Sequence, residues 1–289
     1  MLCQIENSSL SVSADTLGAQ LMSILGADGT QYLWQGDPAY WKGRSPSIFP
    51  YVARLTEKQY TYRGKTYSMP IHGFAPTSDF TLESNSGGSM VFRLDSDERI
   101  YAMYPFRFSY FITYRLDGDT LYVENRVENR DEKTMYFGFG GHPGINVPLD
   151  EGLAFEDYFL EFGPCELRRV EFTSTCFVTG EENPFPLENG RLWLKHWLFD
   201  NDAVVLRGVT GPVTLRSERG EHGVTLSAPG FPLLGFWHKV KSDAPYVCFE
   251  PWSSLPSHSG VIEDFERQSD LISLASGKTY KTEWSLKFF

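Results

Sequence analysis

The sequence predicts an all-β protein that forms one antiparallel β-sandwich domain over residues 1–289, with few short helices. Aromatic residues make up 15% of the chain, and 26 glycines and 17 prolines punctuate it. This composition is typical of many strands joined by turns. Because so many strands would curl or split a single open sheet, we expect two large sheets packed face to face.

The period of the apolar residues supports this assignment. Apolar and polar residues alternate across 106–129, interrupted by Asp117-Gly118, which predicts a long hairpin. Similar patterns predict hairpins that turn at Asp28-Gly29 and Arg63-Gly64, three short strands within 200–230, and a last strand within 277–288. Helical signal is sparse, and residues 189–199 and, more weakly, 262–273 are the only helix candidates.

Charge and composition exclude several classes of function. The net charge of −11, with no basic run, argues against a nucleic-acid or anionic-membrane partner and favours a small-molecule ligand. The four cysteines lack the CxxC spacing of a zinc ribbon, so we expect reduced thiols. No signal peptide and no run of eighteen apolar residues is seen. We therefore expect a cytoplasmic protein, either a monomer or a weak homodimer.

Two loops longer than hairpin turns are where we expect a site. They cover residues 36–55 and 250–265. Near the end of the first loop is Arg54, which follows a hydrophobic stretch without another charge. An arginine in this position is either part of a buried ion pair or a clamp for ligand oxygens.

Two histidines occur where glycine or proline fixes the backbone. His142 stands between Gly141 and Pro143 in "GGHPGIN", and His72 stands in "PIHGFA". Such an imidazole can be a structural plug bonded to a neighbouring carbonyl, a metal ligand or a proton donor to a substrate. Each of these interpretations remains open on the residues alone.

A carboxylate occupies an unusual position in "YVCFEPW", where Glu250 ends an apolar strand. Burial there would raise its pKa toward the range that suits a general base, although a structural ion pair with an arginine is an alternative. Trp237, Phe74 and Trp252 lie close in sequence to these groups. They are either core residues or an apolar platform for a sugar ring.

With these residues assembled, the chain resembles the aldose 1-epimerase (galactose mutarotase) family, and most closely its LacX-type and sugar-phosphate epimerase-like branch. The resemblance rests on five short motifs in order along most of the chain. They are "ARL" with Arg54, "HGF" at 72–74, "GGHPGIN" at 140–146, "LGFWHK" at 234–239 and "CFEPW" at 248–252.

The resemblance implies a β-supersandwich that catalyses mutarotation without a cofactor or metal. Glu250 would be the base at the anomeric hydroxyl and His142 the acid at the ring oxygen, on opposite sides of the sugar. His72 and Arg54 would hold and polarise the sugar, with Arg54 favouring a neutral His72. An ionised Glu250 would favour a protonated His142. Asp202, with Asp200 as the alternative, would contact sugar hydroxyls.

Two other functions and the identity of the sugar stay open. A non-catalytic carbohydrate-binding or regulatory protein would keep the same site without turnover. A cupin-like metalloenzyme would use His72, His142 and either Glu250 or His258, but such sites bring two histidines together in one short motif. The substrate is a hexose or a hexose phosphate. A phosphate would need an additional basic cluster near the pocket, for which Lys239, Lys241, Arg99 and Arg191 are candidates.

Overall fold

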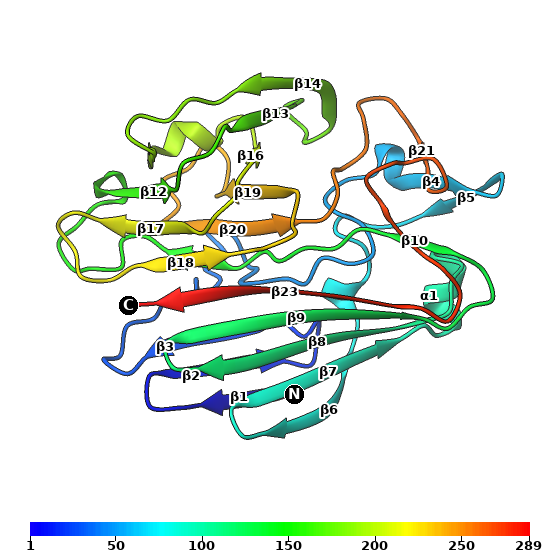
Figure 1. Cartoon of the computed structure of the whole chain (residues 1–289), viewed down its shortest axis with the longest axis horizontal. Helices are drawn as coiled ribbons and strands as arrows, with labels where there is room; N and C mark the ends of the chain where they lie inside the picture. Colours follow the sequence, from blue (N-terminus) through cyan, green and yellow to red (C-terminus); the bar gives the residue numbers. More distant parts are fainter.

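The computed structural model describes all residues from 1 to 289 and consists almost entirely of β-strands (Figure 1). The largest sheet has nine strands. In spatial order they are β15 (Arg191–Trp193), β12 (Tyr158–Phe162), β17 (Val213–Ser217), β18 (Val224–Ser227), β23 (Thr279–Phe288), β9 (Thr120–Asn129), β8 (Phe108–Asp117), β7 (Ser89–Asp95) and β6 (Thr81–Ser86). In Figure 1, β23 crosses the middle of the molecule between β18 and β9.

The second large sheet has six strands and carries the region of interest. Its order is β11 (Gly144–Asn146), β20 (Tyr246–Trp252), β19 (Leu233–Trp237), β16 (Val204–Arg207), β13 (Arg168–Phe172) and β14 (Val178–Pro184). Smaller sheets are β1 (Leu2–Glu6), β2 (Leu10–Asp15) and β3 (Leu21–Gly26); β21 (Glu263–Asp264), β4 (Gln59–Tyr62) and β5 (Lys65–Ser68); and β10 (Met135–Phe137) with β22 (Ile272–Leu274). All pairings are antiparallel except β21 with β4. The expectation of a β-sandwich built on two large sheets is confirmed.

The long hairpin predicted over 106–129 is present as β8 and β9, paired without a slip from Phe108↔Asn129 to Asp117↔Thr120. Every second residue of β9 is buried, as the alternation requires. The other face carries paired charges, such as Lys281 Nζ and Glu124 Oε1 at 3.6 Å. One face of the nine-stranded sheet therefore covers the core and the other faces solvent.

The buried side of this sheet packs on an aromatic core. Phe49, from the first long loop, stacks on Tyr110 with ring centroids 4.3 Å apart and meets Phe108 edge-on at 5.2 Å. Phe74 packs against the same rings, at 5.9 Å from Phe108. Offset and edge-to-face pairs of this kind add to the stabilisation from burial. This core fixes both long segments that lead to the site.

The helix predictions are wrong. Residues 189–199 form β15 and one turn of 3-10 helix, His196–Phe199, because Trp193 pairs with Phe159 of β12 and the sheet overrides the local preference. Residues 262–273 contain β21, a turn and the start of β22. The α-helix that does occur, α1 (Glu98–Met103), starts where Asp97 accepts a hydrogen bond from the Ile100 N–H at 2.7 Å.

No helix has the length and apolar character that crossing a membrane requires.

Two of the three predicted hairpins form as expected. They are β8 with β9, described above, and β4 with β5, which turn at Arg63-Gly64. The three strands expected within 200–230 are also present, as β16, β17 and β18. The turn at Asp28-Gly29 also exists, with the Gly29 N–H bonded to the Gly26 carbonyl. After it, however, only an isolated bridge from Leu25 to Gln31 forms, because the chain crosses to β11, where the Trp34 N–H bonds the Gly144 carbonyl.

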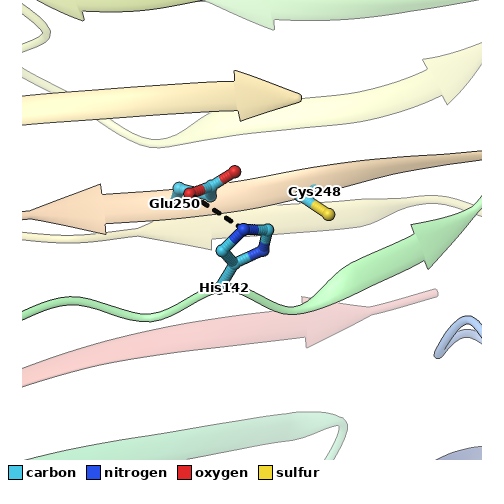
Figure 2. Close-up of side chains that lie close together, drawn as sticks. All are labelled: His142, Cys248 and Glu250. Atoms are coloured by element: carbon cyan, nitrogen blue, oxygen red, sulfur yellow. Dashed lines mark ion pairs between the residues drawn. The ribbon is translucent and has the colours of Figure 1, made fainter. Parts of the chain in front are cut away.

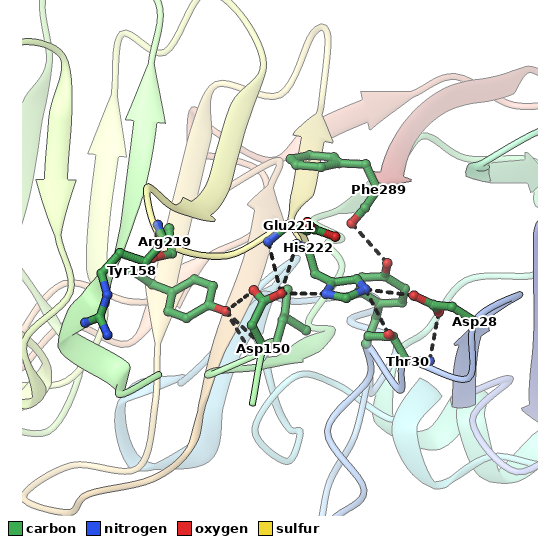
Figure 3. Close-up of polar contacts among 11 residues, drawn as sticks. Asp28, Thr30, Asp150, Tyr158, Arg219, Glu221, His222 and Phe289 are labelled. Atoms are coloured by element: carbon green, nitrogen blue, oxygen red, sulfur yellow. Dashed lines mark hydrogen bonds and ion pairs between the residues drawn. The ribbon is translucent and has the colours of Figure 1, made fainter. Parts of the chain in front are cut away.

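His222 joins three turns that are distant in sequence (Figure 3). Its Nδ1 lies 2.7 Å from Asp150 Oδ1, and its Nε2 lies 2.7 Å from Asp28 Oδ2. Each ring nitrogen therefore donates a hydrogen bond to a carboxylate, which requires the imidazolium form. The hydrogen bonds to Asp28 and then Asp150 raise the pKa of His222 above its usual value. Tyr158 completes the cluster by donating to Asp150 Oδ2 at 2.6 Å.

The His222 cluster makes a testable contribution to stability. Because the folded state raises the pKa of His222, its contribution is complete below the unfolded value of about 6.5 and is lost as pH rises through the folded value. We expect His222→Gln to lower the free energy of unfolding by about 1 kcal/mol in mild acid. The difference from wild type should shrink toward about pH 9, measured by urea denaturation across a pH series.

Lys65→Gln, on an exposed strand outside the cluster, is the control, and its effect should not follow this pH course. A difference between His222→Gln and wild type that grows with pH would contradict the ion-pair assignment.

Candidate active site

Strand β20 places Glu250 in the interior of the six-stranded sheet. It lies between β11 and β19, and all seven of its residues are buried, with Glu250 only 1% exposed. Opposite Glu250 in the register is Gly235, where a Cβ would stand 3.2 Å from the Glu250 Cβ. The missing side chain gives the carboxylate room at this position. Cys248 and Trp252 share the face of Glu250 because side chains alternate along a strand.

His142 is held by backbone bonds on both sides of its segment. Gly140 exchanges hydrogen bonds with Ile48 at 3.1 and 3.2 Å, and the Gly141 N–H donates to the Pro251 carbonyl at 3.2 Å. After His142, the Pro143 carbonyl accepts from the Phe249 N–H at 2.9 Å. The imidazole therefore has a fixed position beside β20.

The glycines before His142 are required by close packing and not by backbone conformation. Neither has the left-handed backbone that favours glycine. A Cβ at Gly141 would lie 2.6 Å from the Trp284 ring, and one at Gly140 would lie 2.6 Å from the Pro251 carbonyl oxygen. Glycine is needed here because the segment passes between the two sheets with no space for a side chain.

His142 and Glu250 form a buried pair (Figure 2). The His142 Nε2 lies 3.4 Å from Glu250 Oε2, and the same oxygen accepts a hydrogen bond from Trp252 Nε1 at 3.1 Å. The indole of Trp41 stacks on the imidazole with centroids 5.0 Å apart. The two groups stand side by side and are too close to hold a pyranose ring between them. The expectation that they lie on opposite sides of the sugar is therefore wrong.

Burial decides the ionisation of this pair. It raises the pKa of Glu250 well above the usual value and lowers the pKa of His142 well below it, so both groups favour their neutral forms. For His142, the neighbouring His72 adds to the lowering. The expectation of an ionised Glu250 beside a protonated His142 does not describe the ligand-free site, because desolvation outweighs their mutual attraction.

His72 presents a neutral imidazole to the same place. The Ala53 N–H donates to His72 Nδ1 at 3.3 Å, so the ring hydrogen is on Nε2. Enclosure of the ring lowers the pKa of His72 to about 4, and Arg54 adds to this in the expected direction. His72 and His142 meet edge to face, with centroids 5.4 Å apart.

These groups line one cavity of about 410 Å³. Seven residues considered for the site from sequence meet there: Arg54, His72, His142, Asp202, Trp237, Glu250 and Trp252. Burial raises the pKa of Asp202, whereas Asp200 is exposed and does not line the cavity. Arg54 and Lys239 are exposed at this site and leave a cationic edge. Lys239 is the one phosphate-binding candidate that the fold brings here.

Two predicted residues lie elsewhere. Phe74 is 1% exposed and packs in the aromatic core, so it is not a sugar platform. Its backbone follows His72, but the left-handed turn at His72-Gly73 directs its ring inward. His258, weighed as a metal ligand, is outside the cavity and pairs through Nδ1 with Glu263 Oε1 at 3.0 Å.

Sequence reasoning missed Trp41, which stacks on His142 and lines the cavity. The available signal was its place in the first long loop, where an aromatic residue has no strand to fill. Four cavity residues also adopt a left-handed backbone without being glycine: Ala53 (φ 52), His72 (φ 61), Cys176 (φ 60) and Asp202 (φ 79). Such strained residues cluster at functional sites, where the surroundings hold them in place.

A larger hollow of about 700 Å³ lies away from these groups, lined by residues 162–168, 184–187, 189 and 190. It contains no histidine, and its carboxylate and guanidinium come from neighbouring positions, Glu166 and Arg168. Size alone therefore does not mark the site. The smaller cavity is the candidate active site because convergent groups with shifted pKa values line it.

The fold and this site define a β-sandwich protein of the galactose mutarotase-like class, and comparisons with known proteins agree. The family described as aldose 1-epimerase matches residues 1–287. The chromosomal protein LacX of Lactococcus lactis subsp. lactis is 34% identical over 291 residues, which cover 96% of this chain and 97% of LacX. The chain therefore belongs to the aldose 1-epimerase family, which confirms the resemblance and supports a sugar epimerase function.

Solved structures show the same fold. A galactose mutarotase related enzyme from Lactobacillus acidophilus is 30% identical, with a TM-score of 0.95 over 100% of this chain and 97% of its own. A galactose mutarotase-like protein from Lactobacillus casei is also 30% identical, with a TM-score of 0.95 over 100% of both chains.

Gly141 offers a test of how the His142 segment is held. A methyl group there meets the Trp284 ring at 2.6 Å, so we expect Gly141→Ala to lower the free energy of unfolding by about 1–3 kcal/mol. The urea denaturation midpoint measures this loss. Gly163→Ala, where nothing lies within 4 Å of the added Cβ, is the matched control. Equal midpoints for the two variants would show that the segment accommodates a methyl group without loss of stability.

Proposed function

We propose that this protein is an aldose 1-epimerase that interconverts the α and β anomers of a hexose or hexose phosphate. Glu250 acts as the base at the anomeric hydroxyl, and His142 acts as the acid at the ring oxygen. The observation that supports this most is the buried pair, with Nε2 and Oε2 3.4 Å apart on the wall of a sugar-sized cavity. O1 and the ring oxygen are bonded to the same carbon, so an acid and a base side by side can reach both.

Ring opening moves one proton through the sugar. The Glu250 carboxylate takes the proton of O1–H, the C1–O5 bond breaks, and O5 takes a proton from His142 Nε2. The sugar is then an open aldehyde, and rotation about C1–C2 presents its other face. Closure reverses each transfer. A positioned acid or base contributes roughly 10²–10⁴-fold to such a rate.

The pair therefore alternates between two states of equal charge. An ionised pair accompanies the closed sugar, and a neutral pair accompanies the open aldehyde. Burial favours the neutral pair, as the opposite pKa shifts of Glu250 and His142 indicate. The environment thus stabilises the state that accompanies the unstable intermediate, and this lowers the barrier to reaching it. Substrate hydrogen bonds to the ionised groups supply the opposite bias when the ring is closed.

The other cavity residues orient the sugar. His72, with its hydrogen on Nε2, donates to a ring or hydroxyl oxygen, and Asp202 accepts from hydroxyls. Trp41 and Trp237 meet at 5.5 Å in a T-shaped pair and offer apolar surface to the carbon face of the ring. Arg54 and Lys239 supply positive charge that favours a phosphorylated substrate over a neutral one.

A non-catalytic carbohydrate-binding protein with the same cavity is the alternative. Optical rotation of fresh α-glucose and α-galactose, and of their 6-phosphates, followed with and without protein, separates the two functions. Acceleration over the spontaneous rate supports the enzyme. Binding without acceleration for every sugar of the panel supports the alternative and overturns our proposal.

Substitution of the base is the sharpest test of the roles. We expect Glu250→Gln to lower the mutarotation rate by at least about 10²-fold, because the amide cannot take the O1 proton. The fold and much of the sugar affinity should remain, checked by urea denaturation and by calorimetric titration. Glu263→Gln, at a buried carboxylate outside the cavity, should keep the wild-type rate. A wild-type rate in Glu250→Gln would remove the base assignment.

The dependence of kcat/KM on pH tests the shared proton. The active pair holds one proton, and a second enters only when His142 is protonated while Glu250 is neutral. Because burial lowers the pKa of His142, the acid limb should have its midpoint below about 6.5. At higher pH the rate falls when Glu250 loses the shared proton at its raised pKa. After the spontaneous rate is subtracted at each pH, an acid midpoint at or above about 6.5 would contradict the neutral pair.

A further inference from the structure

Cys248 is a buried thiol that the proposed reaction does not use. It precedes Glu250 by two residues on β20, so both side chains are on the same face of the strand. It is fully buried and forms no disulfide. One donor atom each from His142, Cys248 and Glu250 lie within 4.8 Å of one another (Figure 2).

We propose that His142, Cys248 and Glu250 bind a thiophilic divalent cation of the Zn²⁺ class, and that this cation reversibly inhibits the enzyme. The ligands are an imidazole nitrogen, the Cys248 Sγ and a Glu250 carboxylate oxygen. Zn²⁺ takes this donor set, with three protein ligands and one position left for water. We infer that this position faces the cavity, because two of the three ligands, His142 and Glu250, line it.

The distances fit with little movement. Donor atoms around a tetrahedral Zn²⁺ stand roughly 3.3–3.8 Å apart. The 3.4 Å between His142 Nε2 and Glu250 Oε2 already lies in this range. The donor atoms lie within 4.8 Å of one another, and a sulfur stands roughly 3.5 Å from a nitrogen or oxygen on the same Zn²⁺, so the thiol must approach by roughly 1.3 Å at most. Because His142 and Glu250 line the cavity, the cation reaches the thiol from the substrate side.

The charges balance in a place where an unbalanced charge is costly. A divalent cation with a thiolate, a carboxylate and a neutral imidazole has zero net charge, which limits the cost of burying the ion. On binding, the thiol proton and the proton that His142 and Glu250 share are released to solvent, and the metal–sulfur, metal–oxygen and metal–nitrogen bonds replace them. The thiolate selects soft cations, so Mg²⁺ and Ca²⁺ should bind this site poorly.

His142 also indicates that the cation is an inhibitor and not a resident cofactor. The residue is more than nine-tenths buried, and its Nδ1 has no hydrogen-bond partner. A metal-binding histidine usually donates its other nitrogen to a carboxylate or carbonyl, and loss of such a partner costs about 10–100-fold in affinity. The bound ion would also remove both groups needed for proton transfer, so metal and substrate exclude each other.

Co²⁺ binding tests the site independently of catalysis. Reduced, untagged protein, freed of chelator and reductant, is titrated with Co²⁺ and watched for the near-ultraviolet sulfur-to-metal charge-transfer band. We expect the band in wild type and its removal by Zn²⁺ but not by Mg²⁺. Cys248→Ala should lack the band. If alanine perturbs the fold, Cys248→Ser is used in its place and should also lack the band. Cys176→Ala, which removes the thiol that lines the cavity itself, should keep it.

Inhibition is the second arm, and it rests on the proposed function. Zn²⁺ should slow mutarotation at a concentration at least about 10-fold lower for wild type and Cys176→Ala than for Cys248→Ala, with recovery on chelation. Equal sensitivity of Cys248→Ala, or no charge-transfer band in wild type, overturns the metal site. A band in a protein that accelerates no sugar of the panel overturns the proposed function and leaves the metal site standing.

Discussion

The burial of one carboxylate in the middle of a sheet is the constraint on which the rest of the site depends. Glu250 is enclosed on β20 between two neighbouring strands, where an isolated charge would cost several kcal/mol. This cost is avoided because burial favours the neutral carboxyl group. The Trp252 indole N–H donates to it, and the His142 imidazole lies beside it. A proton shared between two buried groups follows directly from this arrangement.

The large sheets supply the rigidity that this arrangement needs. His142 can reach Glu250 only because its segment is bonded to Ile48 on one side and to β20 on the other, with glycine where Trp284 leaves no space. The aromatic core under β8 and β9 fixes Phe49, and through it the loop that leads to Ala53 and Arg54. Strained backbone at the cavity is tolerated because these surroundings determine it.

The sequence predicted what depends on local pattern and missed what depends on packing. Alternation gave the β8–β9 hairpin because strand faces repeat every two residues, and the order of short motifs identified His72, His142 and Glu250. The helix expected over 189–199 is wrong because pairing with β12 outweighs propensity. The direction of Phe74 and the neutral state of the acid–base pair depend on tertiary burial, which no local pattern encodes.

Strand geometry also explains why the proposed metal site adjoins the acid–base pair, although the proposed reaction does not require a metal. A period of two places residue 248 on the same face as residue 250, so whichever side chain stands there adjoins the Glu250 carboxylate. The proposed proton transfer needs an acid and a base held close together with little water, and a soft cation prefers the same surroundings once a thiol is added. The proposed proton transfer makes no use of the side chain at position 248. The proposed effect of the Cys248 thiol is therefore to bind a soft cation, and the thiol has no part in the proposed reaction of the sugar.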